Sequence, residues 1–414
     1  MSAEQTIDVA AVKRDVAVLG DEVDGKPLIY LDSAASSQRP GVVLDAMRDY
    51  YEHHHANVHR GAYRLAAEAD AAYERGRRNV ARFIGAPSAR EVIFTKNATE
   101  AINLVAFSWG RANLGPGDAV VLTEMEHHAN IVPWQILAEQ LGFEIRWIPV
   151  GTDGHLDTSE LDRLLDGAKL LALSAMSNVL GTITPVRALS DAAHAAGALV
   201  LADACQYVPH LPTDVTELDV DFLAFSGHKM LGPTGIGVLW GREALLDAMP
   251  PFLGGGGMIS DVHLDGFTTA ELPAKFEAGT PPIAEAVGLG AAVDYLEDLG
   301  MEAVRRHEVE LTAYALRTLR ERFGDDLAIH GPSEPAERGG VMSFAYKDVH
   351  PHDVSQVLDQ DQVCVRAGHH CAKPLMRRLG VGATARASWY VYNDESDVDA
   401  FAESLSRADE WFGF

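Results

Sequence analysis

The order of strand-like and helix-like segments in the middle of the chain constrains its fold more than any other feature. Short aliphatic and aromatic runs with the length of buried strands recur there, at residues 119–122, 144–149, 170–173, 199–202 and 222–225. Helical patterns such as residues 185–196 lie between them. Because parallel neighbouring strands need a long crossover connection, usually a helix, this alternation predicts an α/β domain with a mostly parallel sheet flanked by helices.

Past residue 283 the pattern changes and predicts a second, smaller α+β domain. Helix-forming sequence continues to residue 323, and shorter elements follow. The other expected elements are strands at Leu327–His330, Val341–Tyr346 and 385–392, a last helix over residues 397–411, and an N-terminal helix over residues 3–19 that packs on this domain. A chain of 414 residues is too long for one compact core. We therefore predict a large domain at 25–282 and a small domain made of 1–24 and 283–414.

Composition argues against several classes of partner. The net charge of −26 leaves no basic excess to neutralise phosphates, so we expect neither nucleic acid nor a membrane surface as a partner. No apolar run approaches membrane-spanning length, and residues 1–10 do not resemble a secretory signal. Cys205, Cys364 and Cys371 are an odd number of cysteines in a large chain. They favour a reducing, cytoplasmic setting over a disulfide framework.

Two polar residues stand directly after predicted strands. Lys229 closes the segment Ser226-Gly227-His228-Lys229, and Asp203 ends another strand-like run. A lone lysine in such a turn is ordinarily a solvated surface residue. The pair, however, is what a pyridoxal phosphate (PLP) site needs, because the lysine forms a Schiff base and the carboxylate keeps the pyridine nitrogen protonated. Together they favour a PLP enzyme.

A phosphate site is expected where the strand Val92–Thr95 gives way to a helix. Backbone N–H groups at the start of that helix, with the Thr99 hydroxyl, suit a dianion. Ordinary N-capping by Asn97 or Thr99 would produce the same sequence, so both interpretations stand. Ser226 and His228 are candidates for further phosphate donors.

Histidine clusters raise the question of a metal. Residues 53–55 with His59 form one cluster, and residues 369–370 precede Cys371 in another. Consecutive histidines point in different directions, and no spaced carboxylate or cysteine completes a tetrahedral set, so we predict no metal site. His127 follows a strand, where an imidazole can stack on a cofactor ring. A polar loop histidine is the alternative there.

Several segments resemble, in order, the cysteine desulfurases, and more narrowly the group that includes SufS. The segments are Glu126-His127-His128-Ala129-Asn130, Ser177-Asn178-Val179-Leu180-Gly181-Thr182, Asp203-Ala204-Cys205-Gln206, Ser226-Gly227-His228-Lys229 and Arg366-Ala367-Gly368-His369-His370-Cys371-Ala372. The resemblance spans about residues 28–412. It implies a fold-type I PLP-dependent transferase that converts L-cysteine to L-alanine and keeps the sulfur as a protein persulfide.

The resemblance also assigns the cofactor contacts. Lys229 would hold PLP as a Schiff base, Asp203 would pair with the pyridine nitrogen, and His127 would stack on the ring and assist proton transfer. The remaining contacts implied are Gln206 with the phenolate oxygen, Thr99, Ala98, Ser226 and His228 with the phosphate, and Thr280 with the phosphate of the other subunit in a homodimer.

The resemblance also implies that Cys371 is the nucleophile. Arg386 and Asn178 would hold the substrate carboxylate, and Arg366 would line the same entrance. Arginine suits this role because its planar fork makes two charge-assisted hydrogen bonds. Lys229 would remove the Cα proton, and the Cys371 thiolate would then take the substrate sulfur. The neighbours expected to favour the thiolate are His369, His370 and Arg366.

Two departures from the family pattern stand out. Cys205 occupies the place of an alanine that commonly lies against the second face of the PLP ring. Ala98-Thr99 stands where many relatives have two threonines, so one hydroxyl is missing. Neither change removes a group that the chemistry requires.

Other functions compete with this interpretation. Selenocysteine lyase, or an aminotransferase or epimerase of the same fold, would use the same Lys229, Asp203 and His127. An aminotransferase or epimerase would have no use for a mobile Cys371. A PLP-binding scaffold protein would need no competent lysine.

The resemblance also implies a partner. The predicted sulfur acceptor is a SufE-like or a zinc-bearing SufU-like protein of the iron–sulfur cluster assembly machinery.

Overall fold

The computed structural model describes residues 6–59 and 61–412, and a seven-stranded sheet forms its centre. The strand order is β4-β10-β9-β8-β7-β5-β6. Their bounds are β4 (Val92–Thr95), β5 (Ala119–Thr123), β6 (Glu144–Ile148), β7 (Ala168–Ser174), β8 (Leu199–Asp203), β9 (Phe222–Ser226) and β10 (Gly237–Gly241). The pairs from β9 to β6 are parallel, whereas β10 is antiparallel to both neighbours. The predicted mostly parallel sheet is confirmed.

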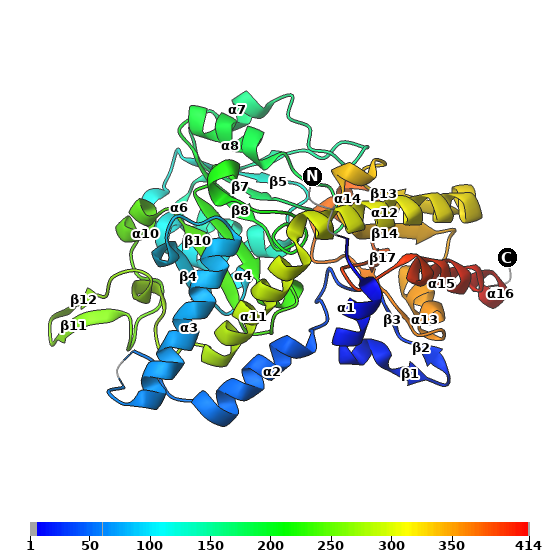
Figure 1. Cartoon of the computed structure of the whole chain (residues 1–414). Coiled ribbons are helices and arrows are strands. Elements are labelled where there is room, and N and C mark those ends of the chain that lie inside the picture. The colour runs from blue at the N-terminus through cyan, green and yellow to red at the C-terminus, as the bar shows by residue number, and fades with distance from the viewer. Residues whose placement is uncertain (1–5, 60, 413–414) are drawn as a thin grey trace, which may run out of the picture.

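Helices cover both faces of this sheet (Figure 1). The main covering helices are α2 (Gly41–Asp49), α3 (Arg64–Phe83), α8 (Val186–Ala195) and α11 (Ile283–Leu299) on one side, and α4 (Ala98–Leu104) and α6 (Val132–Leu141) on the other. Along β9, Leu223 and Phe225 belong to the core on the first side, while Phe222 and Ala224 belong to the core on the second. Because both faces are buried, the strands are apolar throughout rather than alternating.

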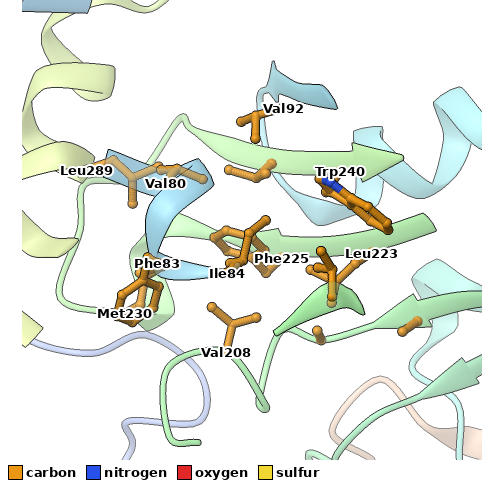
Figure 2. Close-up of a cluster of buried hydrophobic side chains, with 14 of the residues drawn as sticks. Val80, Phe83, Ile84, Val92, Val208, Leu223, Phe225, Met230, Trp240 and Leu289 are labelled. Carbon is orange, nitrogen blue, oxygen red and sulfur yellow. The ribbon is translucent and has the colours of Figure 1, made fainter. Parts of the chain in front are cut away.

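The core on the α3 and α11 side is shown in Figure 2, where Val80 of α3 and Leu289 of α11 lie near each other and belong to the same cluster as the sheet residue Phe225. The two helices approach closely because glycine faces the contact. A Cβ added to Gly76 would lie 2.4 Å from Ala286 O, which no side chain tolerates. Small residues therefore let α11 pack directly on α3.

Several shorter elements surround the central sheet or lie beside the smaller unit. They are α1 (Val9–Asp15), α5 (Arg111–Asn113), α7 (Leu161–Leu165), α9 (Val215–Leu218), α10 (Glu243–Ala248), the pair β1 (Glu22–Val23) and β2 (Lys26–Pro27), and the hairpin β11 (Ile259–His263) and β12 (Gly266–Thr269). The hairpin projects from the body (Figure 1). Within residues 6–59 and 61–412, no helix is both long and apolar enough to span a bilayer.

A four-stranded antiparallel sheet of order β13-β14-β17-β16 forms the second, smaller unit. Its elements are β13 (Leu327–His330), β14 (Val341–Tyr346), β16 (Arg366–Gly368) and β17 (Thr384–Ser388), with α12 (Met301–Phe323), α13 (Pro351–Asp359), α14 (Lys373–Arg378), α15 (Glu395–Ser406) and α16 (Ala408–Phe412). Beside it, β15 (Val363–Cys364) pairs in parallel with β3 (Ile29–Tyr30). The predicted α+β character of this region is confirmed.

Several predicted bounds differ from the structure. Helix-forming sequence after residue 283 is two helices, because Gly300 takes φ 78° and ends α11. The strand expected over 385–392 ends at Ser388, and the last helix divides into α15 and α16. The helix expected over 3–19 is the shorter α1, and residues 1–5 lie outside the described part. The domain boundary at 283 stays a prediction, although α11 packs on the large sheet's core.

Candidate active site

A cavity of about 570 Å³ lies at the carboxyl ends of β7, β8 and β9, next to the small sheet. Ser174, Asp203 and Ser226, the last residues of these strands, all line it. This edge is where open α/β sheets place their ligand sites. The predicted site residues that line the cavity are Ala98, Thr99, His127, Asn178, Asp203, Gln206, Ser226, His228, Lys229, Arg366, Cys371 and Arg386.

Thr280 is the predicted site residue that this cavity does not contain. It lines a second cavity, of about 500 Å³, together with Tyr50 and Thr95. Within one chain, Thr280 and Lys229 therefore belong to different cavities. Its predicted contact with a phosphate held by another subunit stays a prediction.

One side of the first cavity, the sheet wall (His127, Asp203, Ser226 and Lys229), is buried or half-buried. Asp203 Oδ1 accepts the backbone N–H two residues on at 3.1 Å, and His127 Nδ1 does the same at 3.1 Å. Burial and the neighbouring Lys229 charge lower the pKa of His127 to about 4. The ring is therefore neutral at pH 7 and carries its proton on Nε2, which makes it an uncharged surface for stacking.

Glu126, directly before His127, is a buried acid that the sequence reasoning missed. Its carboxylate accepts hydrogen bonds from the Thr123 hydroxyl (2.5 Å), the Ser174 N–H (2.8 Å) and the Asn130 amide (2.7 Å). These bonds tie the end of β5 to the end of β7 and fix the loop that carries His127. Burial nevertheless raises the pKa of Glu126 to about 8. The sequence signal that could have identified Glu126 is the amide side chain of Asn130, four residues after it.

The turn between β4 and α4 is both a helix N-cap and part of the cavity lining. Asn97 Oδ1 accepts the Glu100 N–H at 3.0 Å, which confirms the N-cap interpretation. Ser226 Oγ accepts the Ala98 N–H at 2.9 Å and so joins the lysine loop to this turn. Burial lowers the pKa of His228 to about 4, so its ring would meet a phosphate as a neutral donor. Phosphate binding itself stays a prediction.

Several buried polar atoms around the cavity have no hydrogen-bond partner. They are Asn178 Oδ1, Gln206 Oε1, His370 Nδ1 and Arg386 Nε. Unpaired buried polar atoms are rare and costly, so their gathering here indicates a polar ligand. Asp203 and Lys229 fit a cofactor that has a pyridine nitrogen and an aldehyde carbon, and Arg386 Nε is a free donor for an anion. Asn178 Oδ1 and Gln206 Oε1 are acceptors, and the Gln206 amide already donates to Ala34 O at 2.7 Å.

The opposite side of the cavity, the loop wall (residues 366–371), carries the exposed Cys371. His370 and Cys371 have φ of 49° and 55°, left-handed backbone that costs a non-glycine residue about 1–2 kcal/mol. Two long-range hydrogen bonds hold it: the His128 N–H donates to Cys371 O at 2.7 Å, and the Asn178 amide donates to His370 O at 2.8 Å. The thiol therefore lies on strained backbone that is fastened through its carbonyls.

One predicted role in this loop changes, and Asn178 makes a contact to the loop that was not predicted. His370 does not supply a positive charge to the Cys371 thiolate: its Nε2 faces Thr384 Oγ1 at 2.9 Å, and burial lowers its pKa to about 3. Asn178 uses its amide N–H to hold the loop. Its predicted contact with a substrate carboxylate stays a prediction, for which the unpaired Oδ1 offers no donor.

Asp32, which sequence reasoning missed, joins the two predicted arginines. Arg366 donates from Nε and Nη2 to its carboxylate at 3.1 and 2.8 Å, and Arg386 donates from Nη2 at 3.2 Å. Arg386 also donates from Nη1 to Asn178 O at 2.9 Å. Asp32 follows β3, and no local pattern marks it as a partner of residues more than 300 positions away.

His128, His369 and Cys371 each place one metal-ligating atom within 4.8 Å of the others, a juxtaposition that the sequence did not predict. His128 Nε2 accepts the Lys373 N–H at 3.0 Å, and His369 Nδ1 accepts the Cys371 N–H at 3.1 Å. A neutral imidazole has one acceptor nitrogen, so both rings already use theirs. The arrangement favours N–H donors near the thiol over metal ligands.

Cys205 lines the same cavity, with Sγ 3.9 Å from Ser226 Oγ. Burial and the Asp203 charge raise the pKa of Cys205 to about 12, so it is a protonated thiol at neutral pH. Its predicted place beside a cofactor ring stays a prediction.

Comparisons with known proteins agree with this geometry. Residues 29–401 match the family described as aminotransferase class-V. A probable cysteine desulfurase of Streptomyces coelicolor is 51% identical over 413 residues, covering 98% of each chain. The apo cysteine desulfurase of Thermococcus onnurineus superposes with a TM-score of 0.93 at 41% identity, covering 99% of this chain and 100% of that one. Escherichia coli CsdA, a cysteine desulfurase solved with an S-sulfonic acid, gives 0.89 at 37% identity, covering 98% and 99%.

Proposed function

Because the chain belongs to the class-V aminotransferase family and is a cysteine desulfurase, we propose that it holds the sulfur of L-cysteine as a persulfide on Cys371 and passes it to an acceptor protein for iron–sulfur cluster assembly. The observation that carries this proposal is the position of Cys371. Its exposed thiol lines the same cavity as the half-buried Lys229 and the buried Asp203. One atom can thus face a substrate inside and a partner outside.

The cofactor is pyridoxal phosphate, in keeping with the family. When bound, it withdraws electrons from the Cα of an amino-acid substrate. We propose that Lys229 holds it, that Asp203 pairs with its ring nitrogen, and that the neutral His127 stacks on the ring. The further proposed contacts are Gln206 with the phenolic oxygen and Thr99, Ala98, Ser226 and His228 with the phosphate.

The side chains then divide the proton and sulfur transfers. Lys229 takes the substrate Cα proton. Cys371 Sγ, as a thiolate, forms an S–S bond with the substrate sulfur, and the Cβ–S bond breaks with its electron pair going to Cβ. Two proton transfers complete alanine: Cβ takes one proton, for which the Nε2–H of His127 is a donor in the cavity lining, and Cα takes back a proton from Lys229. Arg386 and Arg366 hold the substrate carboxylate throughout.

The release of sulfur belongs to the loop wall. Cys371 is exposed, so a persulfide there is open to an acceptor thiol, and a SufE-like and a SufU-like acceptor both fit. The three cysteines are free, which suits work in the reducing cytoplasm. A homodimer, with Thr280 serving the partner's phosphate, is part of the proposal.

A test combines product analysis with a matched pair of cysteine variants. Wild-type protein given L-cysteine and a reductant should release alanine and sulfide in equal amounts. Cys371→Ser should lose alanine formation and gain no sulfur atom by mass spectrometry. Cys364→Ser, at a half-buried cysteine away from the cavity, should keep both. Full activity of Cys371→Ser would refute the persulfide role.

Selenocysteine lyase remains the nearest alternative, because the same residues suit both substrates. Turnover of L-selenocysteine without turnover of L-cysteine would favour it. Alanine formation measured with each acceptor type would identify the partner.

A further inference from the structure

Asp32, Arg366 and Arg386 form a charge cluster in which one carboxylate serves two guanidinium groups. The three residues come from separate segments: the chain after β3, the strand β16 and the strand β17. Both oxygens of Asp32 are used, with Oδ1 accepting from Arg386 at 3.2 Å and Oδ2 accepting from Arg366 at 2.8 Å. The Asp32 side chain is 14% exposed and that of Arg386 is 2% exposed, so water screens their attraction little.

The strand register explains why the two arginines need this carboxylate. Arg366 and Arg386 stand directly opposite each other on β16 and β17. Like charges at directly opposed positions destabilise an antiparallel pair. Burial lowers the pKa of Arg386 and the Asp32 charge opposes that effect, while the hydrogen bonds to Asp32 raise the pKa of Arg366. Asp32 thus permits two cations to face one cavity.

The cluster leaves one positive charge without a counter-charge. Two guanidinium groups and one carboxylate give a net charge of +1, and both arginines line the cavity. Arg386 spends two of its five N–H donors on Asp32 and Asn178, while its buried Nε has no partner. A single further carboxylate would satisfy both the charge and the unused donors.

We propose that Asp32 is a positioning and specificity-determining residue for the substrate. It holds Arg366 and Arg386 side by side and sets the charge of their subsite to +1, which selects amino acids that present one α-carboxylate and disfavours doubly charged anions. The inference rests on the proposed substrate-binding role of the two arginines. It assigns Asp32 no contact with the reacting atoms.

The test compares Asp32→Asn with Asp361→Asn. Asp361 is a matched control because its side chain is 13% exposed and it also serves two cations, Lys26 and Arg407, away from the cavity. With Asp32→Asn, the KM for L-cysteine should rise about tenfold, because the arginines lose their shared acceptor, while kcat changes less than about threefold. Asp361→Asn should leave both constants unchanged.

A second readout follows charge selection without turnover. Thermal stabilisation of the protein by propionate and by malonate reports binding of one and of two negative charges. The preference for malonate should increase at least about fivefold in Asp32→Asn, where the subsite charge becomes +2. Asp361→Asn should show the wild-type ratio.

Three results would overturn the proposal. One is a KM for Asp32→Asn equal to that of Asp361→Asn, and another is a loss of kcat at unchanged KM. The third needs no variant and decides the matter if Asp32→Asn fails to fold: wild-type protein that prefers malonate to propionate by about fivefold or more is not tuned to a single charge. Wild-type protein that makes no alanine would instead refute the proposed function, so the two failures are distinguishable.

Discussion

The sheet wall and the loop wall face the same cavity but are held in different ways. Asp203 and Ser226 of the sheet wall end strands that are hydrogen-bonded within the central sheet. In the loop wall, His370 and Cys371 keep left-handed backbone and are fastened through their carbonyls. Groups that hold a cofactor gain from a rigid support, whereas the proposed transfer of sulfur from Cys371 to a partner would gain from a releasable one. The two walls therefore differ in backbone support in the way that their proposed roles require.

Removing Lys229, the lysine of the sheet wall, should have the largest effect on activity. Lys229→Ala should reduce alanine formation at least about a hundredfold, since a positioned acid–base group contributes about 10²- to 10⁴-fold. The visible absorbance of the bound cofactor should be lost or displaced, while the melting temperature stays within a few degrees of wild type. Lys275→Ala is the control, because Lys275 donates to the carbonyls of Leu246 and Asp247 and does not line the cavity. Lys275→Ala should lower the melting temperature and keep the visible absorbance of the cofactor. Loss of that absorbance in Lys275→Ala but not in Lys229→Ala would contradict the assignment of cofactor binding to the sheet wall.

A change of intermediate size loosens the loop wall and leaves the sheet wall intact. Asn178→Ala removes the amide that donates to His370 O, and an unsatisfied buried carbonyl costs about 1–3 kcal/mol. Hydrogen exchange of residues 367–372 should speed up at least about fivefold, with cofactor absorbance unchanged. Asn79→Ala loses a comparable amide contact, to Gly290 O, and should leave exchange in this loop unaltered. Equal exchange in both variants would show that Asn178 does not fasten the loop.

The smallest expected effect is a pH dependence of stability inside the sheet-wall support. Burial raises the pKa of Glu126 to about 8, so the folded chain keeps a proton that the unfolded chain releases above pH 4.5. Its contribution to stability is therefore full below pH 4.5 and is lost as the pH rises through 8. Between pH 5 and 8, urea unfolding should show wild type losing about 1 kcal/mol or more relative to Glu126→Gln.

Glu308 provides a control of opposite sign for that experiment. Burial opposes its ionisation, but His210 and Arg305 lower the pKa of Glu308 below 4.5. Its contribution is present above pH 4.5 and is lost on acidification through the lowered value. Glu308→Gln should therefore change the acid limb of the stability curve, which is the opposite limb from the one that Glu126→Gln changes. Identical slopes for Glu126→Gln and wild type would contradict the raised pKa.

The sheet wall was readable from the sequence because its signals are local. Asp203 and Lys229 each follow an apolar strand, and parallel strands bring their carboxyl ends to one edge. The family resemblance added the roles of His127 and Cys371, which periodicity alone does not supply. Local pattern and resemblance together thus predicted the cavity's composition.

What the sequence could not provide lies in contacts between distant segments. Asp32 meets Arg366 across 334 positions, and the backbone of His128 meets the Cys371 loop. Such pairs depend on tertiary packing, and a single sequence carries no pattern for them. Burial also decided the protonation of His370 and Glu126, which residue type alone predicts differently.

The close contact of α3 with α11 has a consequence for how the chain is made. Asn79 and Gly290, which meet there, are 211 positions apart. At about 5–20 residues per second, a ribosome needs roughly 10 to 40 seconds to travel between them. During that time one apolar face of the nascent central sheet lacks its second covering helix and is open to chaperones or to aggregation. This exposure ends when α11 is synthesised and covers that face of the sheet.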